Sequence, residues 1–122
     1  MTIQVLSQSF TVCQLSKLPE QICSPFHFLS VTDEEISLVC PTPEVPANTL
    51  QREDGWRTFR IAGVLDFSLI GILARISSLL ADQSISIYAL STYNTDYVLT
   101  KDAQFERAIS TLQDAGYTIE ML

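Results

Sequence analysis

The sequence has little of the residues on which most catalytic and nucleic-acid-binding sites depend. It contains one histidine, His27, and seven basic residues against fourteen acidic ones, so the net charge is −7. The basic residues are scattered along the chain, whereas a surface that binds phosphates needs them clustered. We therefore expect no nucleic-acid partner, and the same charge disfavours binding to anionic membranes.

Cysteine is also scarce, and the three residues present are far apart. Cys13, Cys23 and Cys40 are odd in number and form no CxxC pair, which favours free thiols of a core in a reducing compartment. With a single histidine, no clustered set of metal ligands is visible. We expect no metal, no cofactor and a cytoplasmic location.

A targeting segment and a membrane span are not indicated either. The N-terminus lacks a basic region followed by a long apolar run, which predicts that no signal peptide is present. The most apolar tract, residues 61–81, contains Asp66 and Arg75, each of which costs about 2.5–3.5 kcal/mol at the centre of a bilayer. We interpret this tract as a strand that continues into a buried helix, and expect no membrane partner.

That tract opens the clearer half of the chain. Residues 57–62 alternate, with Phe59 and Ile61 on one side, as in a half-buried strand. From Leu69 to Leu80 apolar residues recur at helical spacing, and Ser68 is a suitable N-cap. The pattern predicts a strand, a loop and a helix with one buried face.

The rest of this half predicts two strands, a helix and a strand. Residues 85–90 are apolar on both faces, which favours a strand buried on both sides, and residues 97–99 form its partner after the polar turn 91–96. Asp102 can cap a second helix, and Gly116 occupies its left-handed end. A last alternating strand then completes the β-α-β-β-α-β order of a ferredoxin-like unit.

The first half is a blurred version of the same order. Strands are predicted at residues 10–15, 26–31 and 36–40. Residues 18–23 predict a short helical turn. Pro41, Pro43 and Pro46 break the chain, and residues 46–53 form at most a short helix. Aligning Thr32 with Thr92 pairs similar residues sixty positions apart, which suggests a repeat without proving one.

Two stretches carry a resemblance to a known family. The stretch "GVLDFSLIGILARISSLLADQSISIYALSTYNTDYVLTKD", residues 63–102, resembles the ACT domain. Within that family it is similar to the tandem small-ACT proteins related to CASTOR-type arginine sensors and to the regulatory half of aspartate kinases. "FLSVTDEEISLVC" and "PTPEVP" before "GWRTFRIAG" are similar to the leading module of such proteins.

The resemblance implies an α+β fold of two ferredoxin-like modules of ACT type. Residues 1–54 would be a degenerate N-terminal module and residues 55–122 the C-terminal ACT domain. Antiparallel sheets would pack against helices on one face. It also implies a homodimer that binds an amino acid at the module interface, as a regulatory or sensor protein rather than an enzyme.

Three other functions are alternatives to an amino-acid sensor. A ligand-free oligomerisation module is the main alternative, since a degenerate first half leaves a free sheet edge. A small acylphosphatase-like enzyme is disfavoured, because no glycine-rich phosphate loop with an arginine and no Ser-His-Asp or Cys-His set is visible. An RNA-binding sheet is disfavoured because Tyr88 and Tyr93 lack basic neighbours.

The predicted binding site joins the helix entry to the polar turn. The first N–H groups of a helix attract a carboxylate, and Asp66 and Asp96 suit an ammonium group. Gly71 would allow close backbone approach, although the helix entry lacks the proline that many ACT domains carry near the acid. The ligand-binding residues predicted in this way are Asp66, Phe67, Ser68, Leu69, Gly71, Ser91, Thr92, Tyr93, Asn94 and Asp96.

Each of these residues also has a purely structural interpretation. Asp66 can act only on the helix dipole, worth about 0.3–1 kcal/mol. Asp96 can simply hold its turn through the backbone. Gly71 can be a helix–sheet packing residue, and His27, within a strand, is interpreted as structural.

Overall fold

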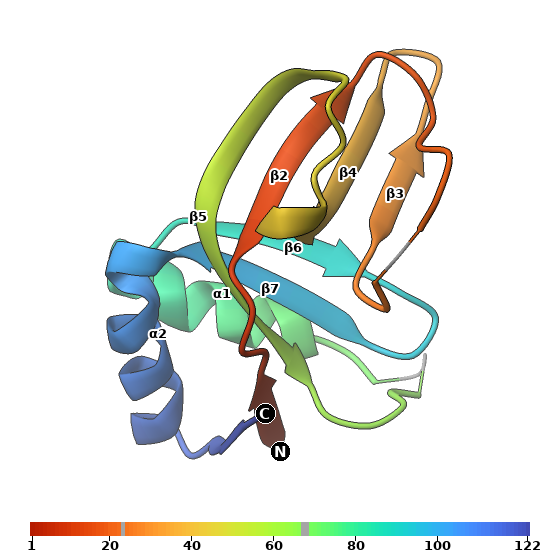
Figure 1. Ribbon diagram of the computed structural model, residues 1–122. Helices are drawn as coiled ribbons and strands as arrows, with labels where there is room; N and C mark the ends of the chain where they lie inside the picture. Colours follow the sequence, from red (N-terminus) through yellow and green to blue (C-terminus); the bar gives the residue numbers. More distant parts are fainter. Residues whose placement is uncertain (23, 67–68) are drawn as a thin grey trace. The chain divides into compact units, whose positions relative to one another are not determined.

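The chain forms two compact units. The computed structural model describes residues 1–22, 24–66 and 69–122 (Figure 1). The C-terminal unit comprises Met1–Ser7 and Arg57–Leu122, and the N-terminal unit comprises Gln8–Trp56. The first seven residues therefore belong to the same compact unit as the second half of the chain. The division into two modules at residue 54 stays a prediction.

The C-terminal unit has the predicted β-α-β-β-α-β order, preceded by one additional strand. The additional strand is β1 (Thr2–Val5), and the order then begins with the end of β5 (Thr49–Ile61). The remaining elements are α1 (Ile72–Asp82), β6 (Ile87–Ser91), β7 (Asp96–Lys101), α2 (Asp102–Asp114) and β8 (Thr118–Met121).

The sheet of this unit is mixed, with the strand order β6-β7-β5-β1-β8. Ile3 of β1 lies opposite Ile61 in an antiparallel pair and opposite Ile119 in a parallel pair. The expectation of a purely antiparallel sheet is therefore wrong. The physical reason is β1, to which the sequence patterns assign no strand, and which separates β5 from β8.

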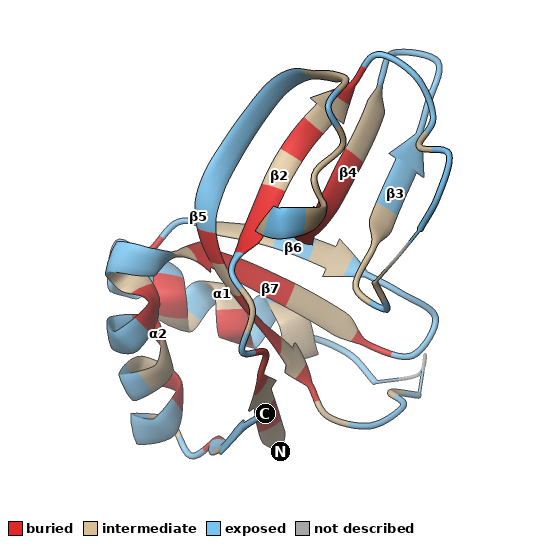
Figure 2. Cartoon of the chain, viewed as in Figure 1, coloured by how far each residue is buried: buried red, intermediate tan, exposed pale blue. Residues whose placement is uncertain are grey.

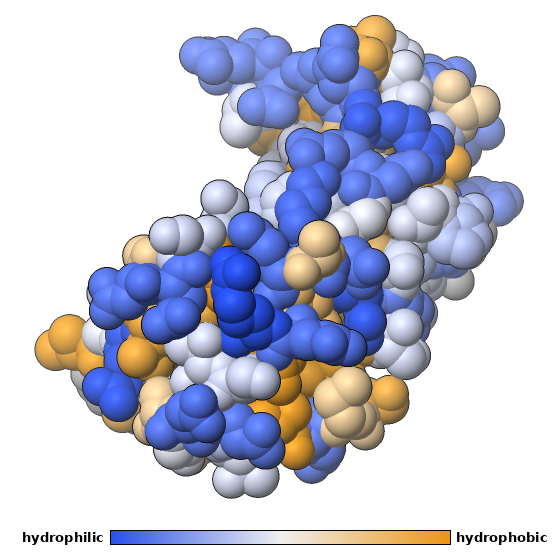
Figure 3. Space-filling view, turned by 90° about the vertical axis from the view of Figure 1, so that its left-hand side faces the viewer, coloured by the Kyte–Doolittle hydropathy of each residue, from blue (hydrophilic) through white to orange (hydrophobic). Residues whose placement is uncertain are grey.

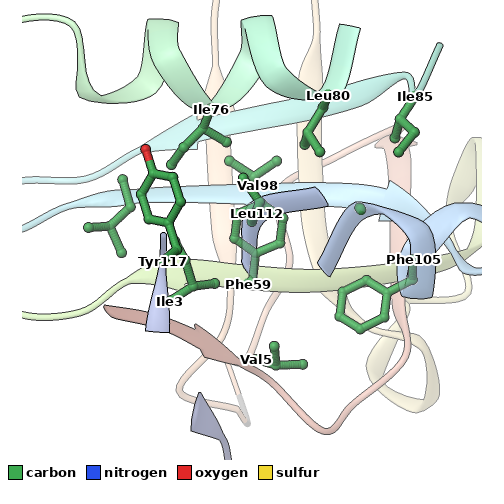
Figure 4. Packing of buried hydrophobic residues seen from close by; sticks show 12 residues of the cluster. Ile3, Val5, Phe59, Ile76, Leu80, Ile85, Val98, Phe105, Leu112 and Tyr117 are labelled. Atoms are coloured by element: carbon green, nitrogen blue, oxygen red, sulfur yellow. The ribbon is translucent and has the colours of Figure 1, made fainter. Parts of the chain in front are cut away.

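Both helices bury apolar side chains against one face of this sheet (Figure 4). Ile76 and Leu80 of α1 and Leu112 of α2 are fully buried with Phe59 and Val98 of the sheet. The predicted helix faces are thus confirmed from Ile72 onwards. Burial of side chains of this size contributes about 1.5–3 kcal/mol each, so this cluster holds α1 and α2 in place.

The start of α1 and the environment of β6 differ from the sequence prediction. The helix begins at Ile72 with Gly71 as N-cap, so Leu69 precedes it and is exposed. Ser68, the predicted cap, lies outside the described residues. Strand β6 is an edge strand that pairs with β7 only and is partly exposed, so burial on both faces is wrong.

Each helix ends in a Schellman motif. In α2 the Gly116 N–H donates to the Gln113 carbonyl and the Tyr117 N–H to the Leu112 carbonyl, and Gly116 has φ +102°, as predicted. In α1 the residue equivalent to Gly116 is Ser84, at φ +58°. A side chain is costly in this left-handed conformation.

The N-terminal unit consists of strands and one short 3-10 turn. Its elements are β2 (Phe10–Leu15), β3 (Phe28–Val31), β4 (Ile36–Pro41), η1 (Thr42–Glu44) and the beginning of β5, and the strand order is β3-β4-β2-β5. Residues 18–22 form no helical turn, and residues 46–53, for which the pattern allowed at most a short helix, form none. Pairing with β2 draws this polar segment into β5 and overrides its weak local preference.

One face of the strands of this unit carries a small core. Cys13, Leu15, Leu38 and Cys40 are buried together, and Val45 from the segment after η1 packs against them. Figure 2 shows that β2 and β4 hold the buried positions while much of β3 and the start of β5 are exposed. The three-residue turn η1 is the only helical segment among the described residues of this unit.

The hairpins β3–β4 and β6–β7 have the same register. Leu29 lies opposite Leu38, and sixty residues later Ala89 lies opposite Val98. In both turns a threonine N–H donates to the carbonyl three residues on, at 3.0 Å in the first hairpin and 2.9 Å in the second. The suggested sixty-residue match is therefore real at the level of the hairpin.

Among the described residues, no helix is both long enough and apolar enough to cross a membrane. The longest, α2, has 13 residues, whereas a span needs about 20. The tract 61–81 contains the end of a strand and the start of α1, as its charges suggested.

We predict that Ser84→Gly stabilises the protein by about 0.5–1 kcal/mol, because glycine adopts a positive φ without steric cost. The Ser84 side chain is exposed, so little else changes. Urea unfolding measures the effect. Ser78→Gly, at an exposed position inside α1, is the matched control and should destabilise by about 0.5 kcal/mol. A loss of stability in Ser84→Gly would contradict the prediction.

Candidate functional site

A cleft of about 300 Å³ lies between the entry to α1 and the turn that joins β6 to β7. Both walls belong to the C-terminal unit. One wall is formed by the loop before α1 and its first turn, the other by the polar turn. The lining residues are Leu65, Asp66, Leu69, Gly71, Ile72, Leu73, Ala74, Thr92, Tyr93, Asn94, Thr95 and Asp96.

The first turn of α1 supplies one end of the cleft with hydrogen-bond donors. The helical ladder begins where the Arg75 N–H donates to the Gly71 carbonyl at 2.9 Å. The N–H groups of Ile72, Leu73 and Ala74 precede it, and the N-cap residue, Gly71, has no side chain with which to cap them. With the helix dipole, such groups favour an anion at this end of the cleft.

Gly71 sets the direction in which the chain enters the helix. Its φ is +79°, a conformation that side chains disfavour. Within the described chain, no atom lies within 4 Å of the position a Cβ would take. The helix–sheet packing interpretation of Gly71 is therefore wrong, and backbone conformation is the reason for glycine here.

Two carboxylates supply the opposite polarity. The Ser91 hydroxyl donates to Asp96 Oδ1 at 2.6 Å, which orients that carboxylate at the start of β7. Asp66 lies on the other wall, where its carbonyl accepts a hydrogen bond from the Leu69 N–H. The described lining residues include no lysine, arginine or histidine, so the cleft has a negative and a donor-rich part.

Hydrogen bonds across the loops hold the two walls together. The Leu65 N–H donates to the Asn94 carbonyl at 2.7 Å, which ties the entry loop to the turn. The buried Thr95 hydroxyl donates to the Ile61 carbonyl at 2.8 Å, which ties the turn to the end of β5. Because each bond joins segments about thirty residues apart in sequence, the cleft depends on the whole unit being folded.

Seven of the ten predicted ligand-binding residues line this cleft: Asp66, Leu69, Gly71, Thr92, Tyr93, Asn94 and Asp96. Ser91 contributes through its bond to Asp96, while Phe67 and Ser68 lie outside the described residues. Sequence reasoning missed Leu65, Ile72, Leu73, Ala74 and Thr95. Gly71 was the sequence signal that could have indicated Ile72, Leu73 and Ala74. The sequence analysis placed Gly71 inside the first turn of the helix, whereas Gly71 is the N-cap that precedes this turn.

The mouth of the cleft carries unusually exposed apolar residues. For comparison, Figure 3 shows the face on the left-hand side of Figure 1, which is mostly hydrophilic and has hydrophobic atoms in separate areas. Leu69 and Tyr93, which line the cleft, and the neighbouring Val64 and Ile70 are all exposed, Ile70 to 95%. Exposed apolar groups beside a binding site mark a surface that a partner can cover.

The cysteines of the N-terminal unit show no sign of catalytic activation. Cys13 and Cys40 are free and buried, and burial raises the pKa of Cys13 and raises that of Cys40 to about 12. A thiol with a raised pKa stays protonated and is a poor nucleophile. The interpretation of these two residues as core thiols is therefore supported, while Cys23 lies outside the described residues.

We predict that Thr95→Val destabilises the protein by about 1–2 kcal/mol, because the Ile61 carbonyl loses a buried hydrogen bond. Thr95→Ser keeps the hydroxyl and is the matched control, with a smaller loss. Chemical unfolding of the three proteins measures the difference. If valine proved as stable as serine at this position, the bond to Ile61 would not be a support of the turn.

We predict that Cys13 and Cys40 resist alkylation by iodoacetamide in the folded protein at pH 8, about 100-fold relative to the urea-unfolded chain. Raising the pH to 9 should accelerate labelling little, because the pKa of each thiol is raised. Site-resolved mass spectrometry gives the rate for each cysteine. Labelling at the unfolded rate would show that these thiols are accessible and ionised.

The chain has relatives of known structure. It superposes on the crystal structure of protein Atu0741 from Agrobacterium tumefaciens with a TM-score of 0.88 and 26% identity, covering 99% of this chain and 92% of the other. The crystal structure of the aspartokinase alpha and beta subunits has a TM-score of 0.66 at 15% identity, covering 94% of this chain and 97% of that one. The second match shows a shared fold.

Sequence comparison points the same way. The chain is 32% identical over 102 residues to rat "Cytosolic arginine sensor for mTORC1 subunit 1", an alignment covering 78% of this chain and 31% of the relative. It thus spans about a third of the length of that protein. The sequence profile of the ACT domain matches residues 51–114, which include the end of β5, both helices and the turn of the cleft. The chain belongs to the ACT domain family.

Proposed function

We propose that the protein is a regulatory or sensor module that binds a free amino acid in the cleft of the C-terminal unit. The observation that carries the proposal is that the cleft has a donor-rich part and a negative part. The N–H groups at the start of α1 suit the carboxylate of an amino acid, and Asp66 and Asp96 suit its ammonium group. A volume of about 300 Å³ suits a small ligand, since ligand pockets range from about 300 to 1,000 Å³.

The two carboxylates favour an amino acid with a second positive charge. One acid can pair with the α-ammonium group while the other meets a cationic side chain, and the described lining residues are all acidic or uncharged. Arginine or lysine fits this charge pattern. The rat relative is named as an arginine sensor, which supports the same class of ligand.

The wider arrangement in this proposal follows the ACT family. Two modules form the chain, of which the N-terminal one is degenerate and the C-terminal one binds ligand. A homodimer would place a neighbouring module at the mouth of the cleft, so that the ligand is enclosed at an interface. The protein acts by binding rather than by catalysis and works in the cytoplasm, where amino acids are plentiful.

A ligand-free interaction module is the second candidate, favoured by the exposed apolar residues at the mouth of the cleft. Val64, Leu69, Ile70 and Tyr93 can serve a protein partner without any small molecule. The two functions differ in one respect, because only the sensor changes its stability when an amino acid is added.

We predict that one amino acid, arginine or lysine, raises the midpoint of thermal unfolding by several degrees. A ligand at 100 times its dissociation constant adds about 2.7 kcal/mol to stability. The measurement compares all twenty amino acids at millimolar concentration with ligand-free protein. A flat response to all twenty would contradict the sensor function and favour the interaction module.

A pair of variants locates the site. Asp96→Asn keeps an acceptor for the Ser91 hydroxyl but removes the charge, so the stabilisation by the amino acid should disappear. Asp33→Asn makes the same charge change in the exposed turn of the other hairpin and should leave the response unchanged. Equal responses in the two variants would show that the ligand binds elsewhere.

A further inference from the structure

The hairpins β3–β4 and β6–β7 have the same register but differ in the polarity of the residue pair next to the turn. In the C-terminal unit Ser91 lies opposite Asp96, and this hydrogen-bonded pair forms part of the candidate site. Sixty residues earlier Val31 lies opposite Ile36. The position that is polar and faces a cleft in one hairpin is therefore apolar in the other.

The elements that cover the hairpin also differ. In the C-terminal unit the face of β7 that carries Val98 is covered by α1 and α2. In the N-terminal unit, the connections 16–27 and 42–48 are short, and their described residues form no α-helix. Leu38, equivalent to Val98, is buried with the cysteines and Val45, so only part of this face is covered.

The uncovered part is an apolar strip at the edge of the sheet. Leu29 and Val31 of β3 share a face with Leu38 and Ile36 of β4, because opposed and alternate residues point the same way. Leu29 is 39% and Val31 57% exposed, and Figure 2 shows the end of β3 as exposed. We call Leu29, Val31 and Ile36 the open face.

The open face has a strongly acidic border. Asp33, Glu34 and Glu35 form the exposed turn between Val31 and Ile36, whereas the equivalent turn of β6–β7, Thr92–Thr95, carries no charge. Residues 8–56 contain two basic and seven acidic residues, a net charge of −5. Two copies of such a face would repel each other, while a basic partner would be attracted.

We propose that the open face is a docking surface for an amphipathic α-helix of a partner protein, one with an apolar stripe and a basic polar side. The helix would lie on Leu29, Val31 and Ile36, on the face of the hairpin that in the C-terminal unit packs against α1 and α2 at Val98. Its lysine or arginine residues would meet Glu34 and Glu35. Burial of the apolar stripe supplies affinity, and the charges supply orientation and association rate.

A panel of synthetic helical peptides tests this inference, with leucine, isoleucine, phenylalanine or methionine on the stripe and lysine on the other side. We expect at least one to bind the full chain, and to lose about tenfold in affinity when its lysines are replaced by glutamate. Fluorescence anisotropy measures both. Failure of every lysine peptide to bind, or equal binding of glutamate versions, would overturn the proposal.

Variants place the binding on the open face. Leu29→Thr combined with Val31→Thr keeps β-branched residues in the strand and should weaken binding about tenfold. Met121→Thr, at an exposed methionine of β8 in the other unit, should bind as the wild type does. Glu34→Gln with Glu35→Gln leaves the apolar strip intact, and should weaken binding about threefold with a smaller dependence on salt.

Two results would assign the surface differently. Unchanged peptide affinity in the threonine double variant would overturn the placement on β3. A concentration-dependent dimer that the same double variant abolishes would show that a second copy, not a partner helix, covers the face. Neither result depends on amino-acid binding, so the inference and the proposed function are tested separately.

Discussion

The packing of α1 against the sheet of the C-terminal unit is the constraint on which its candidate site depends. Ile76 and Leu80 are buried against the strands that carry Phe59 and Val98, which fixes the axis and the rotation of the helix. The first turn of α1 therefore lies beside the turn between β6 and β7. Without this burial, the N–H groups and the two carboxylates would have no defined separation, because only two loops would form the walls of the cleft.

Sequence patterns predicted most of this unit because its helices have strong apolar periodicity. Leu73, Ile76 and Leu80, and Phe105, Ala108 and Leu112, repeat at intervals of three and four residues, which a helix but not a strand places on one side. The start of α1 was misplaced by three residues, because Leu69 fits the same periodicity although Gly71 interrupts the helix with a positive φ. A local pattern does not report a backbone conformation of this kind.

The N-terminal unit was harder to predict because its elements depend on partners distant in sequence. Nothing local marks residues 49–54 as a strand, since the segment is polar and exposed and acquires its structure by pairing with β2. The site was predictable in its two acids and its turn, which lie within a recognisable stretch. Thr95 was not, because its role depends on a hydrogen bond to Ile61, a residue 34 positions away.

The position of β1 between β5 and β8 has a consequence for the order in which the protein can fold. The pairing of Thr2–Val5 with Thr118–Met121 joins segments separated by 116 residues, as in the bond from Gln4 to Glu120. On the ribosome, which adds about 5–20 residues per second, β1 emerges several seconds before β8. The strands β2, β3 and β4 are synthesised long before β8, so the N-terminal unit can form early. The sheet of the C-terminal unit is completed last, when β8 pairs with β1.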